Sequence, residues 1–541
     1  MAYTPSLDPA LYVTANGVGD QRFMDLMAGQ NRTPVGTDRR LPSMALVVGP
    51  SPFSMMRGWE FFITAPTEGV SYIATVLHNA GYPVRIIDVR YAVDPLGEAF
   101  RAIVDGGFDV VGIATFEDNY PWVEELVREV KHARPKVPII LGGSLVTSVP
   151  HVFMAETPAD IAVISEGEIT ILELMEAYVQ GAWARRLPEI RGIWWRGPDG
   201  AVHKNPPRGQ MPNLDSLPNM NIGLWPQAQH PLGMQKQIIS SYSRGCKMDC
   251  SFCYRTTPQE RVKSPQRLRE ELAYLKKNWD IDFAFFVDLT FTAHKKQTRE
   301  ICEVIEEFDL GWTCLTRNAD VDPETLGAMK KSGADIVLYG VESLSKEVLK
   351  EARKGSTENL VIKAMRNTWD AGLRYGGLTI VGLPGETEEG LDHMCTWAEE
   401  HNHITRVKYL SAMPGTTVYQ QGLRDGVIRS EVEHLRWLAT EQALERDEFL
   451  NYNHLPDEVM RRAYRRLYDS YCEGPVMDFH HFPEHLAYFD PDPRPSHAWR
   501  GNFSSVAAHP APGTERFRGL KPSTDGVTLT NVKPSAFTVQ P

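Results

Sequence analysis

The chain has 541 residues, of which 42% are hydrophobic and 23% charged, and its formal net charge is -12 at pH 7. This length exceeds what one hydrophobic core serves, so two or three domains are expected. No apolar run reaches the roughly 18 residues that a membrane helix needs, no signal-peptide pattern opens the chain, and no Lys/Arg block indicates a nucleic-acid partner. These observations predict a cytoplasmic globular protein with neither a membrane nor a nucleic-acid partner.

The first half of the chain predicts a doubly wound, Rossmann-like α/β domain at residues 44–185. Residues 1–43 show no sustained hydrophobic period and are interpreted as an N-terminal extension. From residue 44 on, short β-branched runs such as 110–115, typical of parallel strands buried on both faces, alternate with patterns of helical period. Sheets of this kind bind ligands beyond the carboxyl ends of their strands.

The second half predicts a partial barrel. Residues 186–236 are interpreted as a linker that contains a hairpin. Residues 237–425 contain six alternating strand and helix patterns, which favour an incomplete (β/α)6 barrel over a closed barrel of eight units. Residues 426–541 predict a mainly helical C-terminal region that ends in a Pro-rich tail.

Three of the seven cysteines, Cys246, Cys250 and Cys253, form a C-x3-C-x2-C motif directly after an apolar run. Three thiolates hold three corners of an iron–sulfur cube and leave one iron open. The alternative is a zinc site or merely buried thiols, but structural zinc needs four Cys or His ligands, and neither type recurs between Cys253 and His294. The other four are isolated and are expected to be small buried hydrophobes: Cys302, Cys314, Cys395 and Cys472.

With this cysteine loop and the polar strand ends that follow it, the second half resembles the radical SAM superfamily. The resemblance implies a [4Fe–4S] cluster whose open iron binds S-adenosylmethionine (SAM). It places Phe252 against the adenine, Arg317 on the SAM carboxylate, and Glu342 at the ribose or amino acid end. The SAM-binding residues predicted in this way are Phe252, Asp288, Arg317, Glu342, Ser343, Gly382 and Pro384.

The order of the strand-end loops in the first half resembles the cobalamin-binding domain that precedes the barrel in one radical SAM subfamily. The resemblance implies that Gly142, Gly143 and Ser144 approach the nucleotide tail of the corrinoid. The cobalamin-binding residues predicted in this way are Pro52, Phe53, Gly69, Thr115, Glu117, Asp118, Gly142, Gly143, Ser144, Glu166 and Gly167. A domain kept for packing or for another ligand is the alternative. Because the chain lacks a D-x-H-x-x-G motif, no His is expected below the cobalt.

Together the resemblances imply a cobalamin-dependent radical SAM C-methyltransferase. It would transfer a methyl group from methylcobalamin to an unactivated carbon of a small molecule, such as a natural product or pigment, through a 5'-deoxyadenosyl radical. The expected partners are this substrate and an electron donor such as a flavodoxin or ferredoxin, and no catalytic side chain is identified. The alternatives are a cyclase or ring-rearranging enzyme, like the anaerobic magnesium-protoporphyrin monomethyl ester cyclase, and an inactive corrinoid carrier or sensor. The tail histidines His480, His481 and His485 are interpreted as part of a surface or substrate-capping segment.

Overall fold

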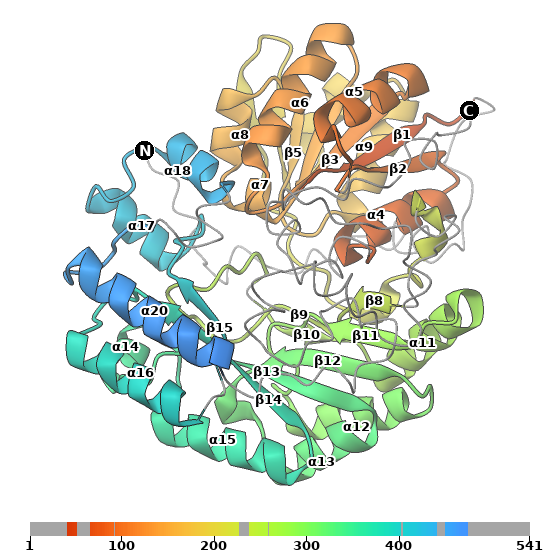
Figure 1. Ribbon diagram of the computed structural model, residues 1–541. Helices are drawn as coiled ribbons and strands as arrows, with labels where there is room; N and C mark the ends of the chain where they lie inside the picture. The colour runs from red at the N-terminus through yellow and green to blue at the C-terminus, as the bar shows by residue number, and fades with distance from the viewer. Residues whose placement is uncertain are drawn as a thin grey trace.

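The computed structural model of the chain describes residues 40–50, 65–90, 92–226, 237–257, 259–401, 404–440 and 449–473. Two largely parallel sheets dominate these residues, and the first lies above the second in Figure 1. Most of the N-terminal extension, Pro52, Phe53 and the tail histidines lie outside the described residues.

The first sheet has the strand order β2-β1-β3-β4-β5-β6-β7, in which β1 to β5 are parallel and β6 and β7 form an antiparallel hairpin. The 2-1-3-4-5 order puts the topological switch point between β1 and β3. The strands are β1 Met44–Val48, β2 Val84–Asp88, β3 Val110–Thr115, β4 Ile139–Gly143, β5 Ile161–Val163, β6 Ile193–Arg196 and β7 Val202–Lys204.

Helices cover both faces of this sheet because successive side chains of a strand point to opposite sides. In β1, Met44, Leu46 and Val48 belong to the core that includes α4 and α9, whereas Ala45 and Val47 belong to the core of α5 and α6. The helices are α4 Glu68–Asn79, α5 Pro95–Gly106, α6 Tyr120–Ala133, α7 Ser144–Ser148, α8 Pro150–Glu156, α9 Glu168–Val179 and α10 Trp183–Arg186.

The second sheet has six parallel strands in sequential order, β15-β14-β13-β12-β11-β8, and its edges β8 and β15 do not pair with each other. It is therefore an open half-barrel. The strands are β8 Gln237–Ser240, β11 Phe283–Phe286, β12 Gly311–Thr316, β13 Ala334–Glu342, β14 Arg374–Val381 and β15 Ile404–Tyr409, and the small hairpin is β9 Ser243–Arg244 with β10 Arg261–Val262.

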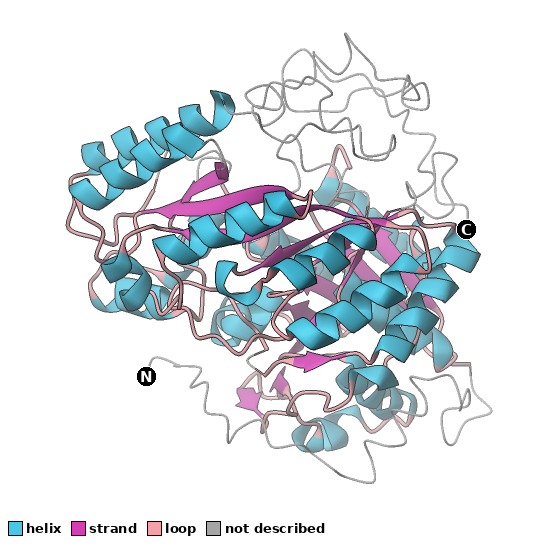
Figure 2. Cartoon of the chain, turned by 90° about the horizontal axis from the view of Figure 1, so that it is seen from below, coloured by secondary structure: helices cyan, strands magenta, loops and turns pink. Residues whose placement is uncertain are grey.

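One face of the half-barrel packs against helices, which Figure 2 shows in front of the strands. Ala284, Phe286, Trp312 and Cys314 share a core with these helices, whereas Phe283 and Phe285 form a separate small cluster with Ala65 of the first half of the chain. The helices are α11 Pro265–Trp279, α12 Lys295–Glu306, α13 Pro323–Lys331, α14 Lys346–Glu351, α15 Glu358–Asp370 and α16 Glu388–His401.

The described C-terminal part is helical, with α17 Thr417–Arg424, α18 Glu431–Leu438 and α20 Asp457–Glu473. Helix α20 packs on β15, where Tyr464 stacks on Tyr409. Within the part of the chain that the structure describes, no helix is both long and apolar enough to span a bilayer. The predicted fold class, a Rossmann-like domain followed by a partial barrel and helices, is confirmed.

Candidate functional site: a cysteine loop between two sheets

The cluster loop, residues 246–253, follows β9 and is held by backbone contacts. Ser251 N donates to the carbonyl of Ala352 (3.0 Å) and Ser251 O accepts from Val418 N (3.1 Å). Inside the loop, the guanidinium of Arg255 donates to the carbonyls of Cys246 (3.1 Å) and Met248. Gly245 enters the loop at φ 84°, and a Cβ there would lie 2.0 Å from the carbonyl oxygen of Gln259. The loop is therefore preformed, and its first turn requires glycine.

The thiols of the loop fit a cluster better than a single ion. Cys246 is buried, and Cys250 and Cys253 are partly buried free thiols. In the described ranges, no set of three or more His, Cys, Asp or Glu side chains converges as the ligands of one metal ion do. A cube of four irons is wider than one ion, so its three thiolates stand farther apart. Structural zinc needs four converging Cys or His ligands, and no such set is found among the described residues.

Two cations face the loop. Burial raises the pKa of the Cys250 thiol, and the charges of Lys354 and Arg317 oppose this rise. Burial next to Cys250 also raises the pKa of Cys253 to about 12, again opposed by Lys354. Because metal binding requires thiolates, Lys354 and Arg317 are placed to stabilise the ligated form.

Glu342, one of the predicted SAM residues, ends β13 in an unusual backbone conformation. Its φ is 61°, and the pairing of β13 with β14 shifts register between Gly340 and Glu342. Its carboxylate accepts from Lys354 Nζ at 2.6 Å, and this ammonium lies 5.8 Å from the centroid of the Phe252 ring. Phe252 therefore shares one charged, largely buried environment with Glu342 and Lys354.

The remaining predicted SAM residues also sit where strands end. Arg317 follows β12 and donates to Asp320 (2.9 Å) and to the carbonyl of Lys354 (2.9 Å), and its buried Nε has no partner among the described residues. Buried polar groups normally have partners, so this N–H is available to a bound carboxylate. Gly382 adopts φ 98° after β14, and its N–H donates to Glu386 (2.7 Å). Ser343 and Pro384 are buried beside these positions.

Asp288, two residues after β11, is held by Ser243 through one carboxylate oxygen, whereas its buried Oδ2 has no partner among the described residues. It is 2% exposed, and its Oδ1 accepts from both the backbone N–H (2.6 Å) and the hydroxyl of Ser243. Burial raises the pKa of Asp288 to about 7. The structure therefore ties this carboxyl to the strand that leads into the cluster loop.

The strand ends of the first sheet bring several predicted cobalamin residues together. Thr115 is buried, donates to the carbonyl of Gly142 (3.0 Å) and accepts from Val146 N (3.0 Å). Gly143 has φ 114° and a Cβ there would lie 2.4 Å from Thr115 O, whereas a Cβ at Gly142 would meet nothing within 4 Å. The backbone at Gly142 is thus open to an approaching group.

Two buried hydroxyls near the same strand ends lack partners in the described part of the chain. They are Thr67 Oγ1, before α4, and Ser165 Oγ, after β5. Unpaired buried hydroxyls are rare, and the amide side chains of a corrinoid supply suitable donors and acceptors. These residues and the open backbone at Gly142 fit cobalamin.

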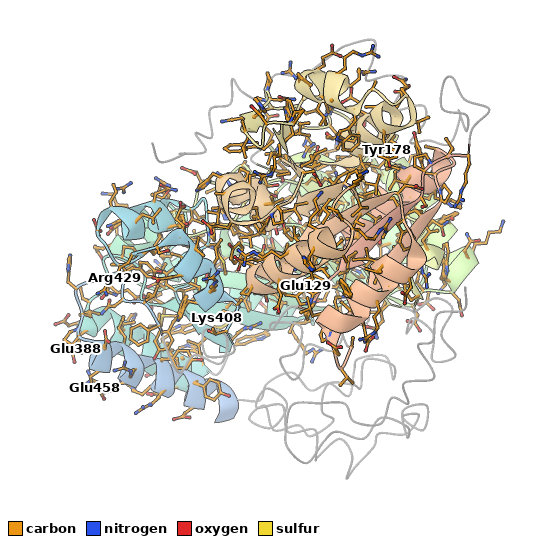
Figure 3. The ribbon with its side chains drawn as sticks, turned by 90° about the horizontal axis from the view of Figure 1, so that it is seen from above. Glu129, Tyr178, Glu388, Lys408, Arg429 and Glu458 are labelled. Carbon is orange, nitrogen blue, oxygen red and sulfur yellow. The ribbon has the colours of Figure 1, made fainter. Side chains whose placement is uncertain are left out.

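Glu117 and Ser144 connect this edge to the second sheet. Burial raises the pKa of Glu117, and the neighbouring charge of Asp118 adds to this rise, while a hydrogen bond from Ser144 and the charge of Lys408 lower the pKa. Lys408 belongs to β15 of the second sheet and is labelled in Figure 3. Tyr254 follows the last cluster cysteine, and its hydroxyl lies 3.3 Å from Ser148 Oγ. The pKa of Tyr254 is raised well above its ordinary value by burial and then by Glu117. Tyr254, directly after the cluster loop, thus contacts α7, the helix that follows β4 of the first sheet.

Arginine side chains and a backbone N–H hold the Glu166 carboxylate. Glu166 accepts from Arg261 (2.7 and 3.0 Å), Arg244 (3.3 Å) and the backbone of Met211 (2.6 Å), so its carboxylate is already occupied. Gly167 precedes α9, and Gly69 lies in the first turn of α4, where a Cβ would meet nothing within 4 Å.

Sequence reasoning missed four residues that the structure brings to this region: Arg244, Tyr254, Lys263 and Lys354. Arg244 and Tyr254 flank the cysteine motif, so their position was a usable signal. Lys263 and Lys354 belong to no motif, and only the fold gives them their partners.

Comparison with known proteins agrees with this geometry. The radical SAM superfamily model matches residues 240–398, and the B12 binding domain model matches residues 63–175. An uncharacterised methyltransferase of Pyrococcus horikoshii is 27% identical over 432 residues, which cover 79% of this chain and 92% of that protein. The anaerobic magnesium-protoporphyrin IX monomethyl ester cyclase of Rubrivivax gelatinosus is 29% identical over 348 residues, which cover 62% of each protein.

Among solved structures, the fold is similar to TsrM of Kitasatospora setae, a radical SAM methyltransferase solved with cobalamin and a [4Fe–4S] cluster. The TM-score is 0.59 at 15% identity, over 80% of this chain and 89% of TsrM. In this chain the B12 binding domain comes first and the radical SAM domain second, and the two matched ranges carry the loops described above. The chain therefore belongs to the cobalamin-binding radical SAM enzymes, whose cofactors are a [4Fe–4S] cluster, SAM and cobalamin.

Proposed function

We propose that this enzyme is a C-methyltransferase that methylates an unactivated carbon of a small molecule. The observation that carries the proposal is the contact of Tyr254, which directly follows Cys253, with Ser148 in the helix after β4. The Tyr254 side chain thereby links the end of the cluster loop to the edge of the first sheet that is expected to bind the corrinoid. Radical formation and methyl donation would then act on the same substrate carbon.

When bound, the cluster and SAM would supply the 5'-deoxyadenosyl radical, and cobalamin would supply the methyl group. The side chains bind and orient. Arg317 would pair with the SAM carboxylate through its free Nε, and Glu342 would accept from the amino group or the ribose hydroxyls. Lys354 would hold the Glu342 carboxylate in place, as its 2.6 Å contact supports.

Close placement of the two sites is a chemical requirement. A carbon radical has to meet the methyl donor before it reacts elsewhere, and fixed orientation of reactants supplies much of the rate. Glu117 and Tyr254 are half-buried, and burial raises the pKa of both, which supports a site with limited access for water.

The names of several relatives support methylation. Besides the Pyrococcus protein, the cytidylyl-2-hydroxyethylphosphonate methyltransferase of Streptomyces wedmorensis is 27% identical over 67% of this chain. The cyclase is the specific rival, because it is 29% identical. A ring-forming reaction would use the radical without consuming a methyl group.

Labelled SAM separates the two reactions. With a deuterated SAM methyl group and a low-potential donor such as a flavodoxin or ferredoxin, the product should gain the label. One turnover converts the substrate and two SAM, with two electrons, to methylated product, methionine, 5'-deoxyadenosine and S-adenosylhomocysteine. The two nucleosides should therefore form in about equal amounts. If 5'-deoxyadenosine forms with the true substrate, but neither label in product nor S-adenosylhomocysteine appears, the methyltransferase proposal is wrong and the cyclase reading replaces it.

A further inference from the structure

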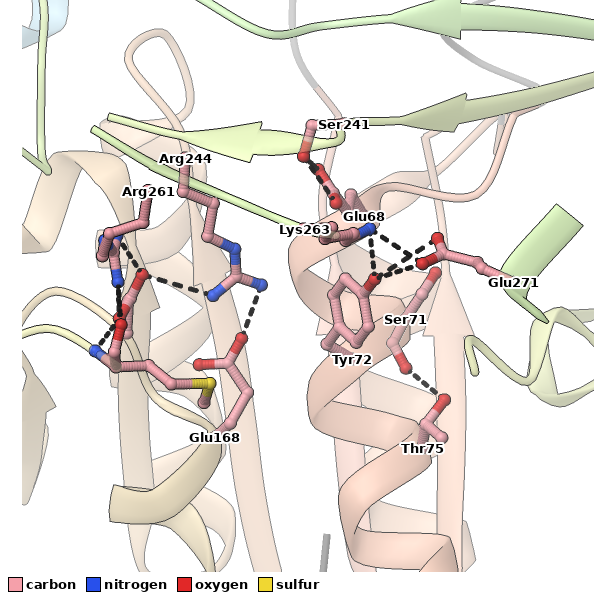
Figure 4. Close-up of polar contacts among 12 residues, drawn as sticks. Glu68, Ser71, Tyr72, Thr75, Glu168, Ser241, Arg244, Arg261, Lys263 and Glu271 are labelled. Carbon is pink, nitrogen blue, oxygen red and sulfur yellow. Dashed lines mark hydrogen bonds and ion pairs between the residues drawn. The ribbon is translucent and has the colours of Figure 1, made fainter. Parts of the chain in front are cut away.

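A buried ionic network joins the two halves of the chain beside the cluster loop (Figure 4). On one side, Arg244 donates to Glu168 (2.8 Å) and to Glu166 (3.3 Å). On the other, Lys263 donates to Glu271 (2.8 Å) and to Tyr72 (3.0 Å). The Arg244 guanidinium also lies 5.3 Å from the centroid of the Tyr72 ring, so the two parts are continuous.

The contacts of Arg244 with Glu166 and Glu168, and of Lys263 with Tyr72, cross between the halves, whereas Glu271 lies in α11 of the second half. Glu166, Glu168 and Tyr72 belong to the first α/β unit, at the start of α9 and in α4, whereas Arg244 and Lys263 flank the cluster loop. Glu68, at the first position of α4, also accepts from the Ser241 hydroxyl at 2.8 Å, in the segment between β8 and β9. The segment that leads to the first cysteine is thus held by three acidic groups of the first unit, Glu68, Glu166 and Glu168.

Arg244 has the shortest covalent path to the cluster. It precedes Gly245 and Cys246, and its side chain is 15% exposed. Its pKa is raised because the charges of Glu168 and Glu166 outweigh the opposing effect of burial. Any shift of α9 relative to the half-barrel is therefore transmitted to the position of the first cysteine.

We propose that Arg244 is a positioning residue that fixes the cluster loop relative to the cobalamin-binding unit and so couples radical formation to methyl transfer. The inference rests on the proposed methyl transfer. This role requires no contact of Arg244 with SAM or cobalamin, because Arg244 acts by setting the separation of the two cofactor sites. Tyr254 ties the other end of the cluster loop to the same unit, so the loop is fixed at both ends.

The test is the ratio of 5'-deoxyadenosine to methylated product. In Arg244→Gln, SAM cleavage should stay within about twofold of wild type, because the SAM residues are untouched, while product should fall roughly tenfold to a hundredfold, the cost of a displacement near 1 Å. Arg244→Lys should restore part of the coupling, since an ammonium pairs with one carboxylate. Glu168→Gln, which leaves Arg244 paired with Glu166, should uncouple less than Arg244→Gln.

Arg436→Gln is the matched control. Arg436, in α18, also pairs with the first unit, at Glu124 (3.0 Å), but far from the cluster loop in sequence and through a half-exposed side chain. The ratio of 5'-deoxyadenosine to methylated product in Arg436→Gln should equal that of wild type. Equal uncoupling in Arg436→Gln, or a proportional loss of 5'-deoxyadenosine and product in Arg244→Gln, overturns the proposal.

A second measurement needs no cofactor and no substrate. Hydrogen–deuterium exchange of the apo-protein should lose protection at β9–β10 and at the start of α9 in Arg244→Gln, with α15 unchanged as an internal reference. Unchanged exchange at β9–β10 contradicts the proposed positioning role. If the wild-type enzyme cleaves SAM but no label enters the product, the methyltransferase proposal is refuted instead. The exchange result then tests only whether Arg244 holds β9–β10 against the start of α9.

Discussion

The buried ion pair between Lys263 and Glu271, which meets Tyr72 of the first half, offers a sharp test of the ionic network beside the cluster loop. Lys263 is 1% exposed, and Glu271 is 0% exposed. Lys263→Met removes the charge but keeps a side chain of similar length. The variant leaves the Glu271 carboxylate buried beside Tyr72, where water cannot replace the lost ammonium.

The cost follows from the partners that remain. At 2.8 Å the attraction is roughly 6 kcal/mol at an effective dielectric constant of about 20, and desolvation offsets much of it. Breaking a buried pair by removing one partner costs about 3–5 kcal/mol. Glu271 keeps Ser240 Oγ at 3.3 Å, Tyr72 OH at 3.4 Å and Arg267 at 3.6 Å, so we expect the lower end, about 3 kcal/mol.

Equilibrium urea unfolding of the apo-protein, followed by tryptophan fluorescence, measures this loss. The double variant Lys263→Met/Glu271→Gln should be more stable than Lys263→Met, because no buried charge is left without its partner. Arg269→Met is the control on the same helix, since Arg269 forms an exposed pair with Glu307 and should change the free energy of unfolding little.

The pH dependence has a defined sign. Burial lowers the pKa of Lys263, but the charge of Glu271 outweighs it and the net pKa is raised. Stabilisation by a lysine with a raised pKa is complete below its unfolded value and is lost only as the pH rises through the folded one. The deficit of Lys263→Met should therefore be constant between about pH 6 and 9. A deficit below about 1 kcal/mol, or a double variant less stable than Lys263→Met, would refute the reasoning.

Four further predictions concern the cofactor sites. Changing any cluster cysteine to Ala should abolish the cluster and SAM cleavage, whereas Cys302→Ala should retain both, and iron analysis should give about four irons per chain. Glu342→Gln should weaken SAM binding about tenfold or more, by equilibrium dialysis, because Lys354 loses its counter-charge. EPR of the cob(II)alamin form should lack axial nitrogen splitting, since the chain has no D-x-H-x-x-G motif. Burial raises the pKa of Glu386 to about 8, so the carboxyl destabilises the fold as the pH rises from about 4.5 to 8; Glu386→Gln should flatten this pH dependence of urea unfolding.

Most of the fold could be predicted from local patterns. The β-branched runs of buried parallel strands and the Ser264–Pro265 helix start carry strong local signals, and α11 begins at Pro265 with Ser264 Oγ accepting from Arg267 N. The sequential strand order of the half-barrel follows from repeated βα units. The domain boundaries at 185 and 236 stay predictions, because they depend on contacts that no local pattern encodes.

The site residues divide by the kind of signal that they carry. The cysteines, Glu342 and Gly382 lie at strand ends, as motif spacing predicted, although their roles toward SAM and cobalamin stay predictions. The Lys354 contact was beyond sequence reasoning, because Lys354 reaches Glu342 only through the bulge of β13 and the turn after α14. The arginine partners of Glu166 were equally beyond sequence reasoning, because Arg244 and Arg261 come from the other half of the chain, and the predicted role of Glu166 toward cobalamin stays a prediction.

The choice of charged groups at this contact follows from what the contact has to do. Apolar packing of similar volume would often stabilise the fold as well or better than buried ion pairs, but apolar surfaces tolerate sliding and repacking. The Arg244 fork reaches two carboxylates at once, and hydrogen bonds of this type are lost after small displacements. A contact that defines one orientation suits an enzyme whose radical and methyl donor have to meet at a single carbon. A small displacement between the two sites would lower the reaction rate strongly, even where it changes the stability of the fold little.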